Sequence, residues 1–181
     1  MAEIIDRNID NDEIIIRYIF EGDFKKNIFI VANIIEKDVF LDTRYSEVSL
    51  LRTRYNNKEN CIKRGFDIKT DFVGYLIFKK SIFEQVVKSI KLEEVRDFEA
   101  KIISTPLDEN FEVIPKENIV TIETPINPGH ADLKYINPGL LFSDENPNIA
   151  IRRFSRKLFK SCKICFGGNN HDNLIKEVYE S

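Results

Sequence analysis

The sequence predicts an α+β fold, a mainly antiparallel sheet of about five to seven strands with helices packed on one side. Two observations predict this class. The first half of the chain is dominated by short runs of β-branched and aromatic residues that end in turn signals. Other segments carry apolar residues at three- and four-residue spacing, which is typical of amphipathic helices.

The segments expected to be strands are short, apolar and rich in residues that favour strands. They cover residues 13–20, 26–35, 37–41, 72–78, 98–104 and 118–123. Glu21, Gly22 and Asp23 form a turn signal after the first of them, and a polar stretch at 56–60 is expected to be a loop. Most of these strands lie early in the chain, before residue 105.

Three segments are expected to be helices. Tyr45, Val48, Leu51 and Tyr55 recur at helical spacing, which predicts a helix over 45–55 with Arg44, Arg52 and Arg54 toward water. An apolar face over 81–90 predicts the second helix. The third covers 147–165, since Asn146 can cap it and Pro147 suits its first position.

The chain of 181 residues is expected to form a single domain. Between the second and third predicted helices, residues 124–146 are rich in proline and glycine, and this segment is predicted to be irregular with at most one short strand. The basic amphipathic helix over 147–165 then follows directly.

Charge is unevenly distributed along the chain, whose net charge is −3. Residues 1–24 and 93–123 are acidic, whereas residues 44–69 are basic. Residues 147–165 carry six cations and no acid, so the rest of the chain carries −3 − 6 = −9. This segregation predicts either internal pairing between blocks or a basic surface on a mildly acidic body.

The basic helix is the main candidate binding site. Its apolar positions share one face, and the cations Arg152, Arg153, Arg156, Lys157 and Lys160 occupy the others. Such a surface suits nucleic acid, because each cation neutralises a phosphate and releases counterions. An acidic protein partner or an ordinary solvated face fits the same pattern. Arg52 and Arg54, interleaved with tyrosines, could add a second basic segment if the two adjoin.

A second candidate is a metal site. Cys162 and Cys165 stand two residues apart and His171 follows, so the three could hold zinc, although a structural zinc site needs four ligands. Two alternatives remain open. The cysteines can simply continue the basic helix, with Gly167 as its left-handed cap, or they can form a redox pair. Apart from zinc, no cofactor is expected.

The third candidate is catalytic. His130 lies in a Pro-Gly-rich segment, two residues before Asp132, and could act as a general base that Asp132 orients. A structural alternative is that His130 bonds nearby backbone carbonyls and holds the segment together. A small hydrolase or nuclease is therefore the rival function.

Common catalytic motifs are missing from the sequence, including the phosphate-binding loop, the dinucleotide fingerprint and the zinc-protease helix. Three cysteines and an acidic start without a signal-peptide pattern favour the cytoplasm, and no apolar run suits a membrane span. We therefore expect a non-enzymatic binding or adaptor protein, a subunit of a larger assembly that contacts nucleic acid or an acidic partner.

Overall fold

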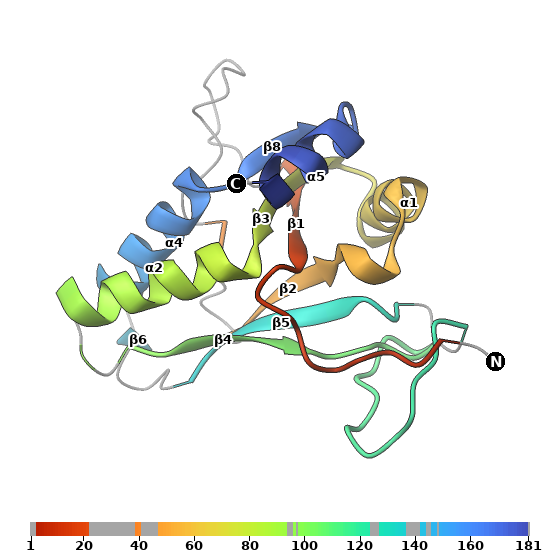
Figure 1. Ribbon diagram of the computed structural model, residues 1–181, viewed down its shortest axis with the longest axis horizontal. Helices are drawn as coiled ribbons and strands as arrows, with labels where there is room; N and C mark the ends of the chain where they lie inside the picture. The colour runs from red at the N-terminus through yellow and green to blue at the C-terminus, as the bar shows by residue number, and fades with distance from the viewer. Residues whose placement is uncertain are drawn as a thin grey trace.

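A computed structural model describes residues 3–21, 39–40, 47–93, 96, 98–123, 127–136, 142–143, 146–147 and 149–180. Within these residues, six strands form one sheet in the order β4-β5-β2-β1-β3-β8, and every neighbouring pair is antiparallel (Figure 1). The same described residues form four α-helices that accompany the sheet. The predicted α+β class with an antiparallel sheet is confirmed.

Strands and helices are interspersed along the described part of the chain. The sheet consists of β1 (Ile14–Phe20), β2 (Glu47–Arg52), β3 (Phe72–Lys79), β4 (Ala100–Ser104), β5 (His130–Tyr135) and β8 (Lys163–Phe166). The helices are α1 (Lys58–Ile68), α2 (Lys80–Glu93), α4 (Ile149–Lys160) and α5 (His171–Glu180). A short 3-10 helix, η2 (Thr53–Tyr55), follows β2, and β6 (Phe142–Ser143) pairs with β7 (Asn146–Pro147).

The sheet is covered on both faces, and β1 shows this most clearly. Ile15 and Ile19 point to one face and join a core that includes side chains of α2 and α4. Ile16 and Tyr18 point to the other face and join a core with α1 and α5. Figure 1 shows α2 and α4 on one side of the central strands and α1 on the other. Helices were expected on one side; α1 and α5 add cover to the second.

The helix predicted over 45–55 is wrong. Residues 45 and 46 lie outside the described part of the chain. Among the described residues of this range, 47–52 form β2 and only the three residues of η2 are helical. Val48 and Leu50 are buried in the first-face core while Ser49 between them is exposed, which is the two-residue period of a strand. Backbone pairing with β1 on one side and β5 on the other outweighs the helical spacing of the apolar residues.

Helix α1 was not predicted, because its sequence is polar enough to resemble a loop. Asn57 caps it: the Asn57 side chain accepts a hydrogen bond from the Asn60 backbone N–H at 2.8 Å. Cys61 and Gly65 are its buried residues. A Cβ on Gly65 would lie 2.5 Å from the Phe72 ring, so glycine permits the close approach of α1 to β3.

The helix predicted over 147–165 is shorter than expected. It spans Ile149–Lys160, and Asn146 and Pro147 belong to β7. Residues 163–166 form β8 instead of continuing the helix, because their backbone pairs with β3. Gly74 makes that pairing possible, since a Cβ at this position would lie 2.2 Å from the Cys165 carbonyl oxygen.

After β8 the chain turns into α5, a helix that was not predicted either. Gly167 and Gly168 have φ angles of 54° and 77°, and they turn the chain between the two elements. Gly167 is therefore part of a strand-to-helix turn, not the cap of the basic helix. The structure thus contradicts the alternative in which Cys162 and Cys165 continue that helix.

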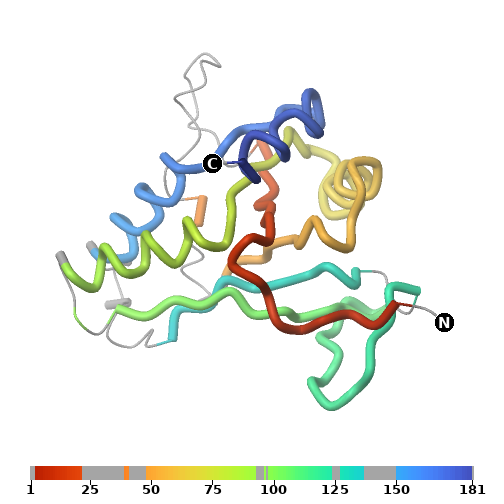
Figure 2. The backbone as a smooth tube through the Cα atoms, viewed as in Figure 1, coloured from red at the N-terminus to blue at the C-terminus, as the bar shows by residue number. Residues whose placement is uncertain are grey.

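Some of the predicted strands are confirmed by the structure and others are not. Those over 13–20, 72–78 and 98–104 are confirmed as β1, β3 and β4, and the helix over 81–90 as α2. The strand predicted over 118–123 is reduced to one bridge between Ile4 and Thr121, and Figure 2 shows the N-terminal segment running beside this part of the chain. The strands predicted over 26–35 and 37–41 lie outside the described residues, apart from the buried Val39 and Phe40.

The prediction that segment 124–146 is irregular with at most one short strand is wrong, because its described residues contain β5, β6 and the first residue of β7. The segment supplies β5, which lies between β4 and β2. Residues 124–126, 137–141 and 144–145 lie outside the described part of the chain. None of the helices in the described part has the length and apolar character that crossing a membrane requires.

Candidate functional site

Helix α4 is firmly anchored by its apolar face. Ile151, Phe154 and Leu158 are completely buried in the first-face core. The Phe154 ring packs against the rings of Phe83 in α2 and Phe98, with centroids 5.6 and 5.3 Å away. These contacts fix the rotation of α4 about its axis, and therefore which of its side chains face solvent.

Four cations form a stripe along the opposite side of α4. We call Arg153, Arg156, Lys157 and Lys160 the cationic stripe, because their three- and four-residue spacing places them on one side of the helix. Arg153, Arg156 and Lys160 are exposed. Lys157 is half-buried, and its Nζ donates a hydrogen bond to Ser89 Oγ in α2 at 3.3 Å. Arg152 is also half-buried and lies to one side of the stripe.

Two members of the stripe are open to a partner. In the part of the chain that the structure describes, no ion pair reaches Arg156 or Lys160. Lys163, the sixth cation of the segment, is instead paired with Glu177 of α5, with Nζ and Oε1 2.5 Å apart. Internal pairing therefore accounts for part of the basic segment but not for Arg156 and Lys160.

The exposed side of α4 offers cations without apolar anchors. Large hydrophobic side chains that are exposed occur elsewhere among the described residues. They are Ile4, Phe66, Ile68, Leu92, Phe111, Val113, Ile119, Ile122, Ile136 and Tyr179. On α4, apart from Ile149, whose side chain is not described, no large hydrophobic side chain is exposed and Phe159 is half-buried. Of the residue types that carry most of the energy of protein–protein interfaces, the exposed side of α4 therefore offers arginine but no exposed aromatic residue.

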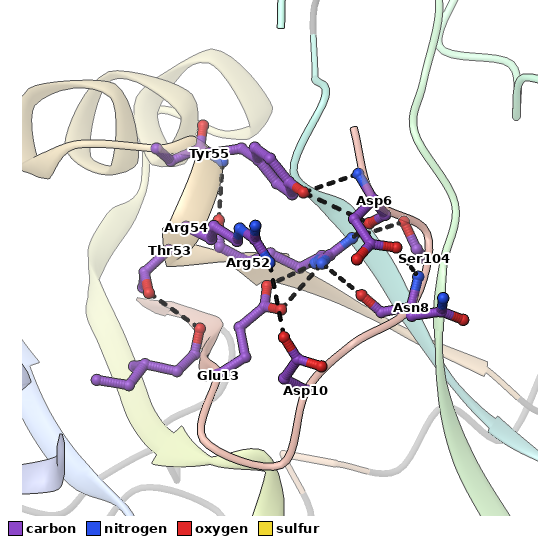
Figure 3. A network of polar contacts seen from close by, with 11 residues as sticks. Asp6, Asn8, Asp10, Glu13, Arg52, Thr53, Arg54, Tyr55 and Ser104 are labelled. Carbon is purple, nitrogen blue, oxygen red and sulfur yellow. Dashed lines mark hydrogen bonds and ion pairs between the residues drawn. The ribbon is translucent and has the colours of Figure 1, made fainter. Parts of the chain in front are cut away.

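Arg52 has a different place from the one expected. It is completely buried, whereas the sequence predicted that it faces water. Its Nε and Nη2 donate to the two carboxylate oxygens of Glu13 at 2.6 and 2.9 Å. Figure 3 shows the guanidinium also reaching the carbonyls of Asp6 and Asn8 and the hydroxyl of Ser104. Arg52 is thus a structural residue that ties four segments together.

The second basic segment does not extend the stripe. Arg54 lies 3.6 Å from the carboxylate of Asp10, and Arg64 donates to Asn56 Oδ1 at 2.9 Å. Helix α1 belongs to the second-face core, whereas α4 belongs to the first. The two basic segments therefore lie over opposite faces of the sheet and form no single patch.

His130 and Asp132 are brought together with Thr105, all three buried where β4 meets β5. The His130 Nδ1 lies 2.9 Å from the Thr105 carbonyl oxygen and 3.0 Å from its hydroxyl. Because a carbonyl can only accept, Nδ1 carries the hydrogen. The Thr105 hydroxyl in turn donates to Asp132 Oδ2 at 2.8 Å.

This geometry differs from a base with its carboxylate orienter. His130 Nε2 and Asp132 Oδ1 are 3.8 Å apart, beyond hydrogen-bond distance. Thr105 stands between the two side chains, and the bond to its carbonyl is the contact that the structural alternative for His130 expects. The cluster therefore joins the end of β4 to the start of β5 through side chains as well as through the backbone.

The three expected zinc ligands are divided between the faces of the sheet. Cys162 packs against the first-face core, and its Sγ donates to the Leu158 carbonyl at 3.2 Å. Cys165 lies in the second-face core, and its Sγ donates to the Asn169 carbonyl at 3.0 Å. His171 Nδ1 lies 2.5 Å from the Tyr75 hydroxyl on this second face. Among the described residues, no three side chains of the metal-binding types gather at one point.

Burial also keeps the thiols protonated. Desolvation raises the pKa of Cys61 to about 12 and raises the pKa of Cys162 and of Cys165. Zinc binding and thiol redox chemistry both require the thiolate. The zinc site remains a prediction that geometry and protonation do not favour.

A cavity of about 420 Å³ opens beside β4. It is lined by Arg7, Asn8, Ile9, Lys80, Ile102, Ile103, Ser104 and Lys116, and His130 is not among them. These residues come from four separate parts of the chain, so no local motif could have revealed the cavity. The buried Arg52 lies behind one wall of it, since Arg52 bonds both Ser104 and the Asn8 carbonyl.

Comparisons with protein-family models, with curated proteins and with solved structures give no match for this chain.

Proposed function

We propose that this protein is a non-enzymatic binding subunit whose cationic stripe on α4 contacts the phosphate backbone of nucleic acid. The observation that carries the proposal is the orientation of α4. Its apolar face is fully buried, and this burial directs Arg153, Arg156, Lys157 and Lys160 toward solvent or the edge of α2.

The composition of the surface favours nucleic acid over an acidic protein. Interfaces with DNA are polar and strongly positive, whereas protein interfaces draw most of their affinity from a few anchor residues, among which buried aromatic side chains stand beside arginine. The stripe supplies guanidinium groups that grip phosphate by two-point hydrogen bonds, and no exposed large hydrophobic side chain of the described residues lies on α4. Phosphate contacts alone do not specify a base sequence, so binding with little sequence preference is expected.

The test is binding of labelled single- and double-stranded DNA and RNA, followed by fluorescence anisotropy. The variant Arg156→Glu/Lys160→Glu reverses the two cations that no described residue pairs with, and it leaves the Lys157–Ser89 contact in place. We expect it to lose at least tenfold in affinity, about 1.4 kcal/mol, while its circular dichroism stays unchanged.

Lys58→Glu/Lys63→Glu is the matched control, because it makes the same change in net charge on α1. Both lysines are exposed, lie on a helix of the second face and, like Arg156 and Lys160, have no ion-pair partner among the described residues. Unchanged affinity in the stripe variant would refute the proposal. If the protein binds a polyglutamate chain but none of the DNA and RNA probes, the result would point instead to an acidic protein partner.

The rival function is a small hydrolase or nuclease that uses His130, and it is supported by the burial of His130 near Asp132. Two features weigh against it. His130 Nδ1 is committed to Thr105, and the cavity beside β4 is not lined by His130. Binding through α4 therefore explains more of the observed geometry than catalysis at His130.

A further inference from the structure

Strand β4 is an outer strand of the sheet, and the pattern of its hydrogen bonds shows which groups point outward. The Thr105 N–H donates to the His130 carbonyl, and the Ile136 N–H donates to the Glu99 carbonyl, both at 3.0 Å. In an antiparallel pair, hydrogen-bonded positions alternate with positions that face away. The backbone N–H and C=O groups of residues 99, 101, 103 and 105 therefore point toward β5. Ala100, Ile102 and Ser104 direct their N–H and C=O groups to the outer edge.

These outward groups are available. No described residue forms a hydrogen bond with the outward backbone groups of Ile102 or Ser104. Both residues line the cavity beside β4, so open volume lies next to this part of the strand. A row of unpaired donors and acceptors at a sheet edge is a template for an added strand.

The cavity is positively charged. Three of its lining residues are cations, Arg7, Lys80 and Lys116, and none is an acid. Lys80 is paired with Glu84, with Nζ and Oε1 3.2 Å apart, so the uncompensated charge comes from Arg7 and Lys116. Arg7 is held rigidly, since Nη1 donates to the Ile114 carbonyl at 3.2 Å and Nη2 to the Pro115 carbonyl at 2.7 Å. Lys116 is exposed, and within the described chain it has no ion-pair partner. Lys116 is therefore available to pair with a carboxylate in the cavity.

Apolar and hydroxyl groups complete the lining. Ile9 and Ile102 supply apolar surface beside the strand edge. Ser104 is 3% exposed, and its Oγ accepts a hydrogen bond from Arg52 Nη1 at 3.1 Å. Because the oxygen accepts from Arg52, the hydroxyl hydrogen stays free to donate. The cavity thus combines backbone pairing, positive charge and an apolar wall.

From these features we infer that the edge of β4 binds an extended acidic peptide segment of a partner protein as a seventh strand. Its backbone pairs with Ile102 and Ser104. Its side chains alternate between apolar residues against Ile9 and acidic residues toward Lys116. The site is separate from the cationic stripe on α4, and the inference does not depend on the proposed function. A small anion would use the charge of the cavity but not the strand edge, so the peptide accounts for more of the lining.

The probe is a fluorescein-labelled octapeptide of alternating glutamate and valine, titrated into the full-length protein. Its control is the same peptide with N-methyl groups on alternate backbone amides, which keeps charge and side chains but blocks strand pairing. We expect the methylated peptide to bind at least tenfold more weakly. In hydrogen exchange, the amides of Ile102 and Ser104 are expected to slow when the unmodified peptide binds.

Charge is tested separately with Lys116→Glu, which is expected to weaken binding of the unmodified peptide by about tenfold. Lys63→Glu on α1 makes the same change in charge away from the cavity and is expected to have no effect. Absence of binding at about 1 mM peptide would overturn the inference. Equal affinity for the methylated and the unmodified peptide would also overturn it, because the cavity would then attract anions by charge alone. Equal affinity of Lys116→Glu and the wild type for the unmodified peptide would overturn it as well.

Discussion

Arg52 and Glu13 form a two-point ion pair inside the protein, with Nε–Oε1 at 2.6 Å and Nη2–Oε2 at 2.9 Å. Arg52 ends β2, and Glu13 directly precedes β1. The remaining hydrogens of the guanidinium go to the N-terminal segment and to Ser104 of β4. One side chain therefore joins the segments that build one wall of the cavity beside β4.

The first prediction concerns this pair. Arg52→Leu is expected to reduce the free energy of unfolding by about 3–5 kcal/mol, because it leaves a buried carboxylate without a counter-charge. The double variant Glu13→Leu/Arg52→Leu is expected to cost less than the sum of the two single changes. Urea denaturation of the four proteins of this cycle measures the difference. Strict additivity would show that the two side chains do not depend on one another.

The second prediction concerns His130. We assign it a structural role, because Nδ1 bonds the Thr105 carbonyl where β4 meets β5. His130→Ala is expected to lower the free energy of unfolding by about 1–3 kcal/mol, through the unpaired buried polar groups that it leaves. Its affinity for nucleic acid through α4 is expected to stay unchanged. Hydrolysis of a phosphodiester by the wild type that disappears in His130→Ala would establish the rival function.

The third prediction concerns pH and His171. Burial lowers the pKa of His171 below its ordinary value of 6.5, and the nearby Asp172 opposes this only in part. The unfolded chain therefore binds a proton near pH 6.5 that the folded protein does not accept. The stability associated with the neutral ring is complete above pH 6.5. It is lost as the pH falls from there through the lower folded-state pKa.

His171→Gln removes this titration and retains an acceptor for the Tyr75 hydroxyl. Chemical denaturation at pH 7.5 and at pH 5 provides the comparison. The difference in unfolding free energy between wild type and variant is expected to shrink at the lower pH. A difference that grows as the pH falls would mean that the folded protein favours the protonated ring.

The fourth prediction concerns metal. Cys162 and Cys165 lie on opposite faces of the sheet, and burial holds both thiols protonated. Protein purified without chelator is expected to contain well under one equivalent of zinc by elemental analysis, and EDTA is expected to leave its melting temperature unchanged. A full equivalent of zinc, absent from Cys165→Ser, would restore the metal site that the sequence suggested.

The sequence alone could predict the elements whose apolar pattern is long and one-sided. The strand β3 and the helix α2 were predicted because Tyr75 to Phe78 form an unbroken apolar run and Phe83 to Ile90 a single apolar face. β2 was mistaken for a helix, since its apolar residues fit both periods and only pairing with β1 and β5 decides between them. The basic face of α4 could be predicted as α2 was, because all of its residues lie close together in the sequence on a single helix.

The burial of Arg52 could not be predicted, because it depends on contacts with Glu13 and Ser104, which lie 39 and 52 positions away in the sequence. The division of Cys162 and Cys165 between two faces likewise follows from the pairing of β8 with β3. The cavity beside β4 collects residues from four parts of the chain, and no single segment carries its signature. Contacts between residues far apart in the sequence are thus the features that local sequence patterns do not predict.

The cationic stripe is tested most directly by the salt dependence of nucleic-acid binding. The logarithm of the association constant for duplex DNA is plotted against the logarithm of salt concentration for wild type and for Arg156→Gln/Lys160→Gln. If both side chains neutralise phosphates, the slope is expected to become shallower by about 1.8, which is roughly 0.9 for each phosphate that the variant no longer neutralises. An unchanged slope would contradict the proposed role of the stripe, because it would show that Arg156 and Lys160 release no counterions on binding.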